Sequence, residues 1–263
     1  MPSSIGRKYG RKVPAPLPGH RMLSNVSALI PNVADTRSFC GPIKDQGQEG
    51  SCTGHAFSSA DEWINRKYLN RSPILSPQFF YAEELLYDGN FPQDDGSDGT
   101  TGCIVAIVKG CCEASVYPYV AGQILQPTAT QLQNALAYTL GAYHGLVGSK
   151  VALSVLGDPT PWPVEIGFTV YESFESDTVA QTGIYSPGTG EAVLGGHEVL
   201  MVGYDIGPTP TLRPANCPPA ALIQNSWGTG WGWNGSGFFW MVLPVLDASD
   251  TDLKIVHSGS PWK

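Results

Sequence analysis

The chain has 263 residues, of which 42% are apolar, and its formal net charge at pH 7 is −8. A chain of this length and apolar content can bury a substantial core without disulfides, while its 31 glycines and 22 prolines indicate many loops. Because phosphate binding requires clustered lysine and arginine, the negative balance excludes a general nucleic-acid binder. No apolar run is long enough for a membrane span or a signal peptide. We therefore expect no membrane partner, and a location that is either cytoplasmic or reached by export without a recognisable signal peptide.

The N-terminal segment differs from the rest of the chain in charge. Residues 1–21 contain no acidic side chain and five basic ones, namely Arg7, Lys8, Arg11, Lys12 and Arg21. The string VPAPLPGHRML, residues 13–23, is typical of an extended, proline-rich connector. We predict that residues 1–34 form a basic extension, which is either a propeptide docked on its own acidic domain or a solvated, frayed tail.

Helical patterns dominate the part of the chain that follows this extension. Apolar residues recur at helical spacing from Cys52 to Tyr68, which predicts a buried helix that starts at the cysteine. The same periodicity predicts further helices over residues 75–87, 104–112 and 132–140. We assign residues 35–130 to a helical lobe.

Beyond residue 150 the sequence pattern changes to short apolar runs separated by glycine and proline clusters. The runs predict strands over residues 151–156, 164–171, 197–204, 221–227 and 237–243. The stretch IGPTPTLRPANCPP, from Ile206, is too rich in proline for anything but a surface loop. Because the helices precede the strands, the pattern predicts an α+β fold in which residues 131–263 form a β-rich lobe with an antiparallel or barrel-like sheet.

Six cysteines do not define a metal site or a disulfide pattern. They are Cys40, Cys52, Cys103, Cys111, Cys112 and Cys217. No CxxC spacing or neighbouring histidine accompanies the adjacent pair Cys111 and Cys112, so we expect no metal and no cofactor. The even count alone does not establish pairing in a chain of this length.

The string DQGQEGSCTGHAF places Cys52 among glycines and polar residues, directly before the first predicted helix. Free N–H groups and the positive end of the helix dipole favour a thiolate at this position. His197 follows two glycines at the predicted entrance of a strand, about 145 residues downstream, and Asn225 ends a later strand. A cysteine, a histidine and an asparagine are the nucleophile, the base and the base-orienting group of thiol catalysis.

With these motifs the sequence resembles the papain-like cysteine peptidase family from about residue 35 to residue 242. The matching strings are QGQEGSC, VYPY, GGHEVLMVGYD and QNSWGTGWGWNGSGFF, in the order of the family. The resemblance implies a two-lobed papain-like fold with the active site in the cleft between the lobes. It also implies that Cys52 is the nucleophile, His197 the base, Asn225 its orienting group and Gln46 a donor to the oxyanion, while Trp227 shields the histidine.

The chain also departs from the family at positions near the nucleophile and the base. Glu49 stands where the family has a cysteine, so the usual neighbouring disulfide cannot form, and Thr53 replaces an aromatic residue. Glu198 follows the base where a small residue is common, and the paired-glycine substrate wall is matched only loosely. We assign substrate binding to Gly96, Gly99, Gly196, Glu198 and Trp227.

We therefore predict a monomeric cysteine endopeptidase that acts on peptides or proteins and is autoinhibited as a zymogen by its own N-terminal segment. The alternatives are a catalytically silent papain-fold binding protein, and a transferase or deamidase that uses the same thiolate. Acidic residues fall on segments that the resemblance places near the cleft, namely Glu49, Asp94, Asp95, Asp98 and Glu198. We expect them to favour basic or neutral substrates over acidic ones.

Overall fold

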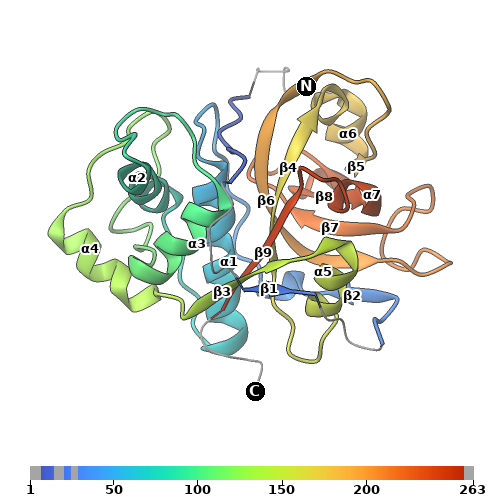
Figure 1. Ribbon diagram of the computed structural model, residues 1–263, viewed down its shortest axis with the longest axis horizontal. Coiled ribbons are helices and arrows are strands. Elements are labelled where there is room, and N and C mark those ends of the chain that lie inside the picture. Colours follow the sequence, from blue (N-terminus) through green and yellow to red (C-terminus); the bar gives the residue numbers. More distant parts are fainter. Residues whose placement is uncertain (1–6, 15–20, 25–28, 258–263) are drawn as a thin grey trace.

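The computed structural model describes residues 7–14, 21–24 and 29–257. Most of the predicted proline-rich connector lies outside these residues, as do both ends of the chain. Helices occupy one side of the molecule and a large sheet occupies the other (Figure 1). This arrangement confirms the predicted two-lobed α+β fold.

The helical side is built from four helices: α1 (Cys52–Tyr68), α2 (Pro77–Asp88), α3 (Gly99–Val108) and α4 (Ala129–Ala135). Local sequence explains several of their ends. The Ser76 side chain accepts the Phe79 N–H at the start of α2, and Gly89 ends this helix in the left-handed conformation, with φ of 73°. Helix α1 begins at Cys52, as the sequence predicts, and α4 extends across the predicted lobe boundary between residues 130 and 131.

Nine strands of the described residues form one sheet. They are β1 (Met22–Leu23), β2 (Val33–Asp35), β3 (Ala142–Leu146), β4 (Val164–Tyr171), β5 (Ile184–Tyr185), β6 (Val193–Asp205), β7 (Ala220–Gln224), β8 (Phe238–Val242) and β9 (Asp252–His257). The order is β1-β3-β9-β4-β6-β7-β8-β5, with β2 on β6. Most pairs are antiparallel, but β1 and β3 are parallel, as are β5 and β8. The sheet remains open and does not close into the barrel that the sequence suggested.

One predicted strand is wrong. Residues 151–156 belong to helix α5 (Gly148–Leu156), which contacts β6 and the short helix α7 (Leu243–Leu246). An apolar run of six residues does not distinguish a strand from a buried helix, because both place every side chain in the core. The remaining short helices are η1 (Arg37–Phe39), η2 (Leu136–Tyr138), η3 (Glu172–Glu175), α6 (Asp177–Thr182) and η4 (Trp233–Gly235).

The end of the predicted N-terminal extension is part of the sheet. Strand β1 pairs with β3, and β2 runs antiparallel to the C-terminal end of β6. The extension therefore includes two strands in addition to its basic residues.

Helix α1 joins the two sides of the molecule. Its buried residues, among them Phe57, Trp63 and Ile64, belong to the same apolar cluster as Val199 and Leu200 of β6. This shared core fixes the start of α1 relative to β6, the strand that carries His197. In the part of the chain that the structure describes, no helix has both the length and the apolar character needed to cross a membrane.

Candidate active site

The three predicted catalytic residues come from three elements that meet at the junction of the helices and the sheet. Cys52 is the first residue of α1, and Asn225 directly follows β7. His197 lies within β6, in register with Phe168 of β4, and not at a strand entrance as the sequence suggested. Its position inside the sheet gives the imidazole a rigid backbone and an apolar surround.

Asn225 orients the imidazole of His197. The Nε2 atom of His197 lies 2.8 Å from the Oδ1 atom of Asn225, which assigns the ring proton to Nε2. The other ring nitrogen, Nδ1, is buried and has no hydrogen-bond partner among the described residues, so it is available as the base. Burial lowers the pKa of His197 to about 4, against the opposing effect of Asn225.

Aromatic rings enclose this pair. The Trp227 ring lies 5.2 Å from the His197 ring, and those of Phe168 and Phe174 lie 5.9 and 6.1 Å away. These rings exclude water from the bond between His197 and Asn225, which strengthens that bond. Phe168 and Phe174 were not identified from the sequence, where they are indistinguishable from other apolar residues of the core.

In this conformation the burial of Cys52 opposes the thiolate that the sequence leads us to expect at the start of α1. Cys52 is fully buried, and this burial raises its pKa to about 12. The backbone N–H groups of Glu198 and Gly10 face the sulfur and oppose the shift, while the charge of Glu198 adds to it. The N–H groups and the dipole at the start of α1 therefore do not offset the effect of burial on the pKa of Cys52.

Two hydrogen bonds fix the side chain of Gln46, the predicted oxyanion donor. Its side chain is buried, its Nε2 donates to the Glu49 carbonyl at 2.9 Å, and its Oε1 accepts from the Ser226 hydroxyl at 2.6 Å. These two bonds fix the amide plane and leave the second N–H of Nε2 for a substrate. Ser226, adjacent to Asn225, is a positioning residue that the sequence analysis missed.

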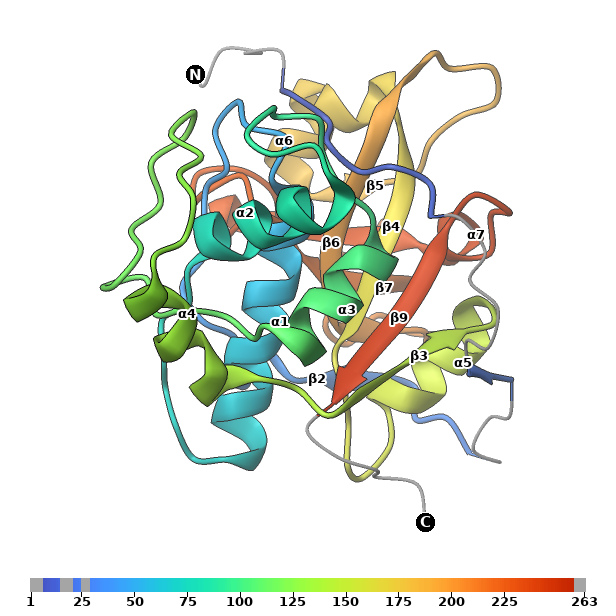
Figure 2. The same cartoon turned by 60° about the vertical axis from the view of Figure 1, so that its left-hand side comes forward.

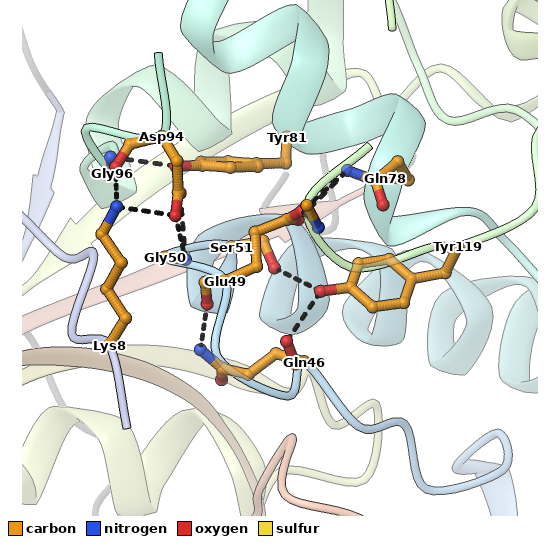
Figure 3. A network of polar contacts seen from close by, with 11 residues as sticks. Lys8, Gln46, Glu49, Gly50, Ser51, Gln78, Tyr81, Asp94, Gly96 and Tyr119 are labelled. Atoms are coloured by element: carbon orange, nitrogen blue, oxygen red, sulfur yellow. Dashed lines mark hydrogen bonds and ion pairs between the residues drawn. The ribbon is translucent and has the colours of Figure 1, made fainter. Parts of the chain in front are cut away.

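The segment before the helix, residues 45–51, is called here the nucleophile loop. Two carboxylates hold it, as Figure 3 shows. The Glu49 carboxylate accepts from Gln78 Nε2 at 3.1 Å and from the Gly122 N–H at 2.7 Å. Asp94 accepts from the Gly50 N–H at 3.0 Å and from the Tyr81 hydroxyl at 2.6 Å.

These hydrogen bonds take the place of a covalent link. All six cysteines lie in the described part of the chain, and all six are free thiols. Glu49 stands where the family has a cysteine, so the disulfide usual at this place is not expected here. Burial raises the pKa of Glu49, while its hydrogen bonds from Gly122 and Gln78 oppose the shift.

Residues 7–12, called here the arm, lie in the active-site cleft. The arm runs between the helices and strands β4 and β6 (Figure 2). The Arg11 N–H donates to the Gly196 carbonyl at 3.1 Å on the sheet side, and the Lys12 N–H donates to the Ser97 carbonyl at 2.7 Å on the helical side. The arm is therefore hydrogen-bonded to both walls of the cleft.

Charged and aromatic side chains of the arm reinforce its position. Arg7 lies 3.2 Å from the Asp45 carboxylate, with its guanidinium carbon 4.8 Å from the centre of the Trp227 ring. Lys8 pairs with Asp94 at 2.6 Å. The Tyr9 ring lies edge-on to His197, with 6.2 Å between the ring centres.

The predicted substrate-binding residues have different places in this cleft. A Cβ atom on Gly96 would collide with the Gly10 carbonyl, and one on Gly196 would lie 2.5 Å from the Arg11 carbonyl oxygen, so both glycines form walls against the arm. Gly99 instead faces the carboxylate of Glu198. Ser97, whose backbone pairs with the arm, was missed because its contact uses no side chain.

A buried thiol, an oriented imidazole and a fixed amide donor make a site for acyl transfer through a cysteine. The fold and this site together define a papain-like thiol hydrolase. Sequence comparison agrees, because the family model for the papain family cysteine proteases matches residues 30–248. The chain belongs to the papain family.

Individual relatives come from distant organisms. The cathepsin B-like cysteine proteinase 5 of Caenorhabditis elegans is 38% identical over 256 residues, covering 81% of this chain and 70% of the relative. A peptidase C1-like protein of Acanthamoeba polyphaga mimivirus is 27% identical over 77% of this chain and 70% of its own length. The chain spans 56% of the oryzain gamma chain of Oryza sativa subsp. japonica, with 27% identity over 82% of this chain.

Solved structures show the same fold at low sequence identity. Xylellain, a cysteine protease from Xylella fastidiosa, superimposes with a TM-score of 0.83 at 22% identity and covers 96% of this chain and 98% of its own. Procathepsin L 3 of the Tenebrio molitor larval midgut gives a TM-score of 0.71 at 21% identity, over 95% of this chain and 76% of its own.

Proposed function

We propose that this chain is a cysteine endopeptidase that its own arm holds inactive. The observation that carries the proposal is the complete burial of Cys52 beneath the arm, where the N–H of Gly10 faces its sulfur. A nucleophile in this state is inaccessible to a substrate. The residues needed for catalysis surround it nonetheless, and they act once the arm leaves.

In the open enzyme the thiol transfers its proton to His197 Nδ1, and the thiolate attacks the carbonyl carbon of a peptide bond. The oxyanion accepts hydrogen bonds from the free N–H of Gln46 and from the backbone N–H of Cys52. The imidazolium then protonates the amine as the C–N bond breaks, which leaves a thioester on Cys52. Water deprotonated by His197 hydrolyses this thioester and restores the thiol.

The geometry of Gly10 explains why the arm inhibits without being cut. Its N–H faces the Cys52 sulfur, while its carbonyl group packs against Gly96. The electrophilic carbonyl carbon is thus directed away from the nucleophile, and a thiol whose pKa is raised is itself a poor nucleophile. The arm therefore resists cleavage without any strain in its backbone.

Gly10 also provides the sharpest test of the proposal. A Cβ atom at this position would overlap the backbone carbonyl of Gly50, and neither backbone can move easily. Gly10→Ala should therefore displace the arm from the full chain and raise the hydrolysis of small peptides by at least tenfold. Val13→Ala is the matched control, because Val13 is 71% exposed and lies just beyond the arm.

Covalent labelling separates this proposal from a silent binding protein. A peptide-like electrophile should modify Cys52 rapidly in Gly10→Ala and slowly in the unmodified chain. Equal labelling of the two proteins would contradict inhibition by the arm. Labelling without peptide cleavage, together with acyl transfer to an added amine or release of ammonia from a side-chain amide, would favour a transferase or a deamidase.

A further inference from the structure

Arg11 is the most deeply buried cation of the arm. Its side chain is 1% exposed, whereas those of Arg7 and Lys8 are 24% and 47% exposed. Both Nη atoms of Arg11 donate to the Asp250 carbonyl at 3.3 Å, and its Nε lies 3.9 Å from Glu198 Oε2. An arginine is rarely buried in this way unless the site is built for a cation.

The carboxylate beneath Arg11 is buried and lies beside two cations, Arg11 and Lys254. The Glu198 side chain is 1% exposed, and within the described part of the chain its Oε2 receives no hydrogen bond. Burial raises the pKa of Glu198 to about 7, while the charges of Lys254 and Arg11 oppose this rise. A buried carboxylate with one oxygen that receives no hydrogen bond is costly, so it attracts a cation that enters the cleft.

The other charged groups around Glu198 also have partners apart from it. Lys254 forms an ion pair with Asp252, and Asp98 accepts the N–H groups of Thr100 and Thr101 at the start of α3. Burial raises the pKa of the neighbouring Glu165 well above its usual range. Arg11 is therefore the cation that the arm itself brings to the Glu198 carboxylate.

Two glycines make the space that the Arg11 side chain fills. A Cβ atom on Gly167, which pairs with Glu198 across β4 and β6, would lie 2.5 Å from Arg11 Nε and 2.6 Å from Glu198 Oε2. A Cβ atom on Gly99 would lie 2.9 Å from Glu198 Oε1. Any other residue at Gly167 would close the site to a long side chain.

The site lies next to the nucleophile. Arg11 follows Gly10, the residue that covers Cys52, and its own N–H bonds to the carbonyl of Gly196, two residues before Glu198. We infer that Glu198, with Gly99, Gly167 and the Asp250 carbonyl, forms a pocket that selects an arginine side chain of the substrate close to the scissile bond, and that Arg11 occupies this pocket in the closed chain. This inference rests on the proposed peptidase function.

The chemistry of the pocket favours arginine over lysine. The Asp250 carbonyl accepts from both Nη atoms at once, which the planar guanidinium allows and a single ammonium does not. Lys254 also lies beside the carboxylate, and a compact ammonium is more strongly hydrated than a guanidinium. The carboxylate of Glu198 disfavours acidic side chains in this pocket.

The first experiment measures binding to the pocket without using activity. In the full chain, Arg11→Ala empties the pocket, and ethylguanidinium at millimolar concentration should then raise the melting temperature of this variant. Ethylurea, which has similar shape but no charge, should have no effect, and neither compound should act on the unmodified chain. The double variant Arg11→Ala with Glu198→Gln should lose the response to ethylguanidinium.

Arg11→Met serves as a second starting variant that retains most of the side-chain volume, in case Arg11→Ala folds poorly. No response to ethylguanidinium in either variant would overturn the pocket. A response of equal size in the presence of Glu198→Gln would also overturn it, because the cation would then bind elsewhere.

The second experiment measures selectivity in the full-length Gly10→Ala variant. Matched peptides carry arginine, lysine, leucine or glutamate at each of the two positions on either side of the scissile bond. At one of these positions kcat/KM should be at least tenfold higher for arginine than for leucine, and Glu198→Gln should reduce this ratio at least tenfold. Peptide cleavage with a ratio that Glu198→Gln leaves unchanged would overturn the inference.

The two experiments separate failure of the pocket from failure of the proposed function. If Gly10→Ala cleaves no peptide while ethylguanidinium still binds in a Glu198-dependent manner, the endopeptidase proposal fails and the cation pocket stands. If peptides are cleaved but ethylguanidinium does not bind, the pocket fails and the endopeptidase proposal stands.

Discussion

The nucleophile loop and the arm lie against each other in the same cleft, but they are held by different kinds of contact. The loop is held by buried hydrogen bonds (Figure 3). Gln46 donates to the Glu49 carbonyl within the loop, and Gln78 of α2 donates to the Glu49 carboxylate. The arm is held at its outer end by ion pairs that solvent reaches, such as that of Arg7 with Asp45. Asp94 serves both, because it accepts from the Gly50 N–H and pairs with Lys8.

This difference indicates which part can move. Exposed ion pairs contribute less than about 1 kcal/mol each and weaken with salt, whereas an orphaned buried polar group costs about 1 to 3 kcal/mol. The outer end of the arm, Arg7 and Lys8, is therefore held more weakly than the loop. Loss of the arm also exposes Cys52 and His197 to water, which favours their charged forms.

The largest effect is expected from the nucleophile itself. In the Gly10→Ala background, Cys52→Ala should reduce peptide hydrolysis to the uncatalysed rate, because no other group can form the thioester. The melting temperature should change little, since the substitution removes only a sulfur atom. Continued hydrolysis by a purified Cys52→Ala sample would show that Cys52 is not the nucleophile.

The next effect concerns the oxyanion donor on the loop. Gln46→Ala in the Gly10→Ala background should lower kcat by roughly a hundredfold or more, with a smaller change in KM, because the lost hydrogen bond acts on charge that develops in the transition state. Ser226→Ala, which frees the amide of Gln46 without removing it, should cause a smaller loss. A larger rise in KM than fall in kcat for Gln46→Ala would assign this residue to substrate binding alone.

The carboxylate that anchors the loop should matter for stability. Glu49→Ala leaves the Gln78 amide and the Gly122 N–H without their acceptor, and it should lower the free energy of unfolding by about 2 kcal/mol. Lys8→Ala, on the arm, should change it by less than about 0.5 kcal/mol. Urea unfolding of both variants tests the contrast, and equal losses would show that the two regions are held alike.

A pH effect is expected where the loop meets α1. His55 is buried against the Ser51 carbonyl, with 2.9 Å between that oxygen and its Nδ1, and burial lowers its pKa to about 3. Between pH 6.5 and 3 the unfolded chain binds a proton at His55 that the folded chain does not, so this residue destabilises the fold as the pH falls. The slope is at most about 1.4 kcal/mol per pH unit.

The variant His55→Asn isolates this contribution, because the asparagine amide can replace the Nδ1 donor without titrating. Buried acids with raised pKa values, such as Asp61 and Glu84, act in the opposite direction but are common to both proteins. The free energy of unfolding should therefore fall less steeply below pH 6.5 in His55→Asn than in the unmodified chain. If the free energy of unfolding falls equally steeply with pH in both proteins, His55 does not cause this pH dependence.

The smallest effect is that of salt on the arm. Raising the ionic strength from about 0.05 to 0.5 M screens the exposed pairs of Arg7 and Lys8 and should increase the activity of the full chain severalfold. Gly10→Ala, whose arm is already displaced, should respond much less. A salt response of equal size in both proteins would place the effect on the enzyme itself and not on the arm.

Local sequence signals were sufficient for the helices around the nucleophile and for the family. Cys52 at the start of α1 follows from a glycine-rich loop before a helical apolar pattern, and both are properties of consecutive residues. The loss of the family's disulfide beside the loop is expected from Glu49, because a carboxylate cannot form a disulfide. The segregation of helices and strands along the chain likewise predicted an α+β fold.

Tertiary structure decided the features that depend on burial or on distant partners. Helix α5 could not be distinguished from a strand, because a short apolar run fits either when every side chain is buried. The raised pKa of the Cys52 thiol results from burial. The basic charge of the N-terminal segment predicted that it docks on its own domain, but nothing in residues 7–12 indicated that Gly10 lies against this sulfur. Arg11 and Glu198 are far apart in the sequence, and only the fold brings their side chains together. Their opposite charges alone did not predict this pair, because the sequence contains many other acidic and basic residues.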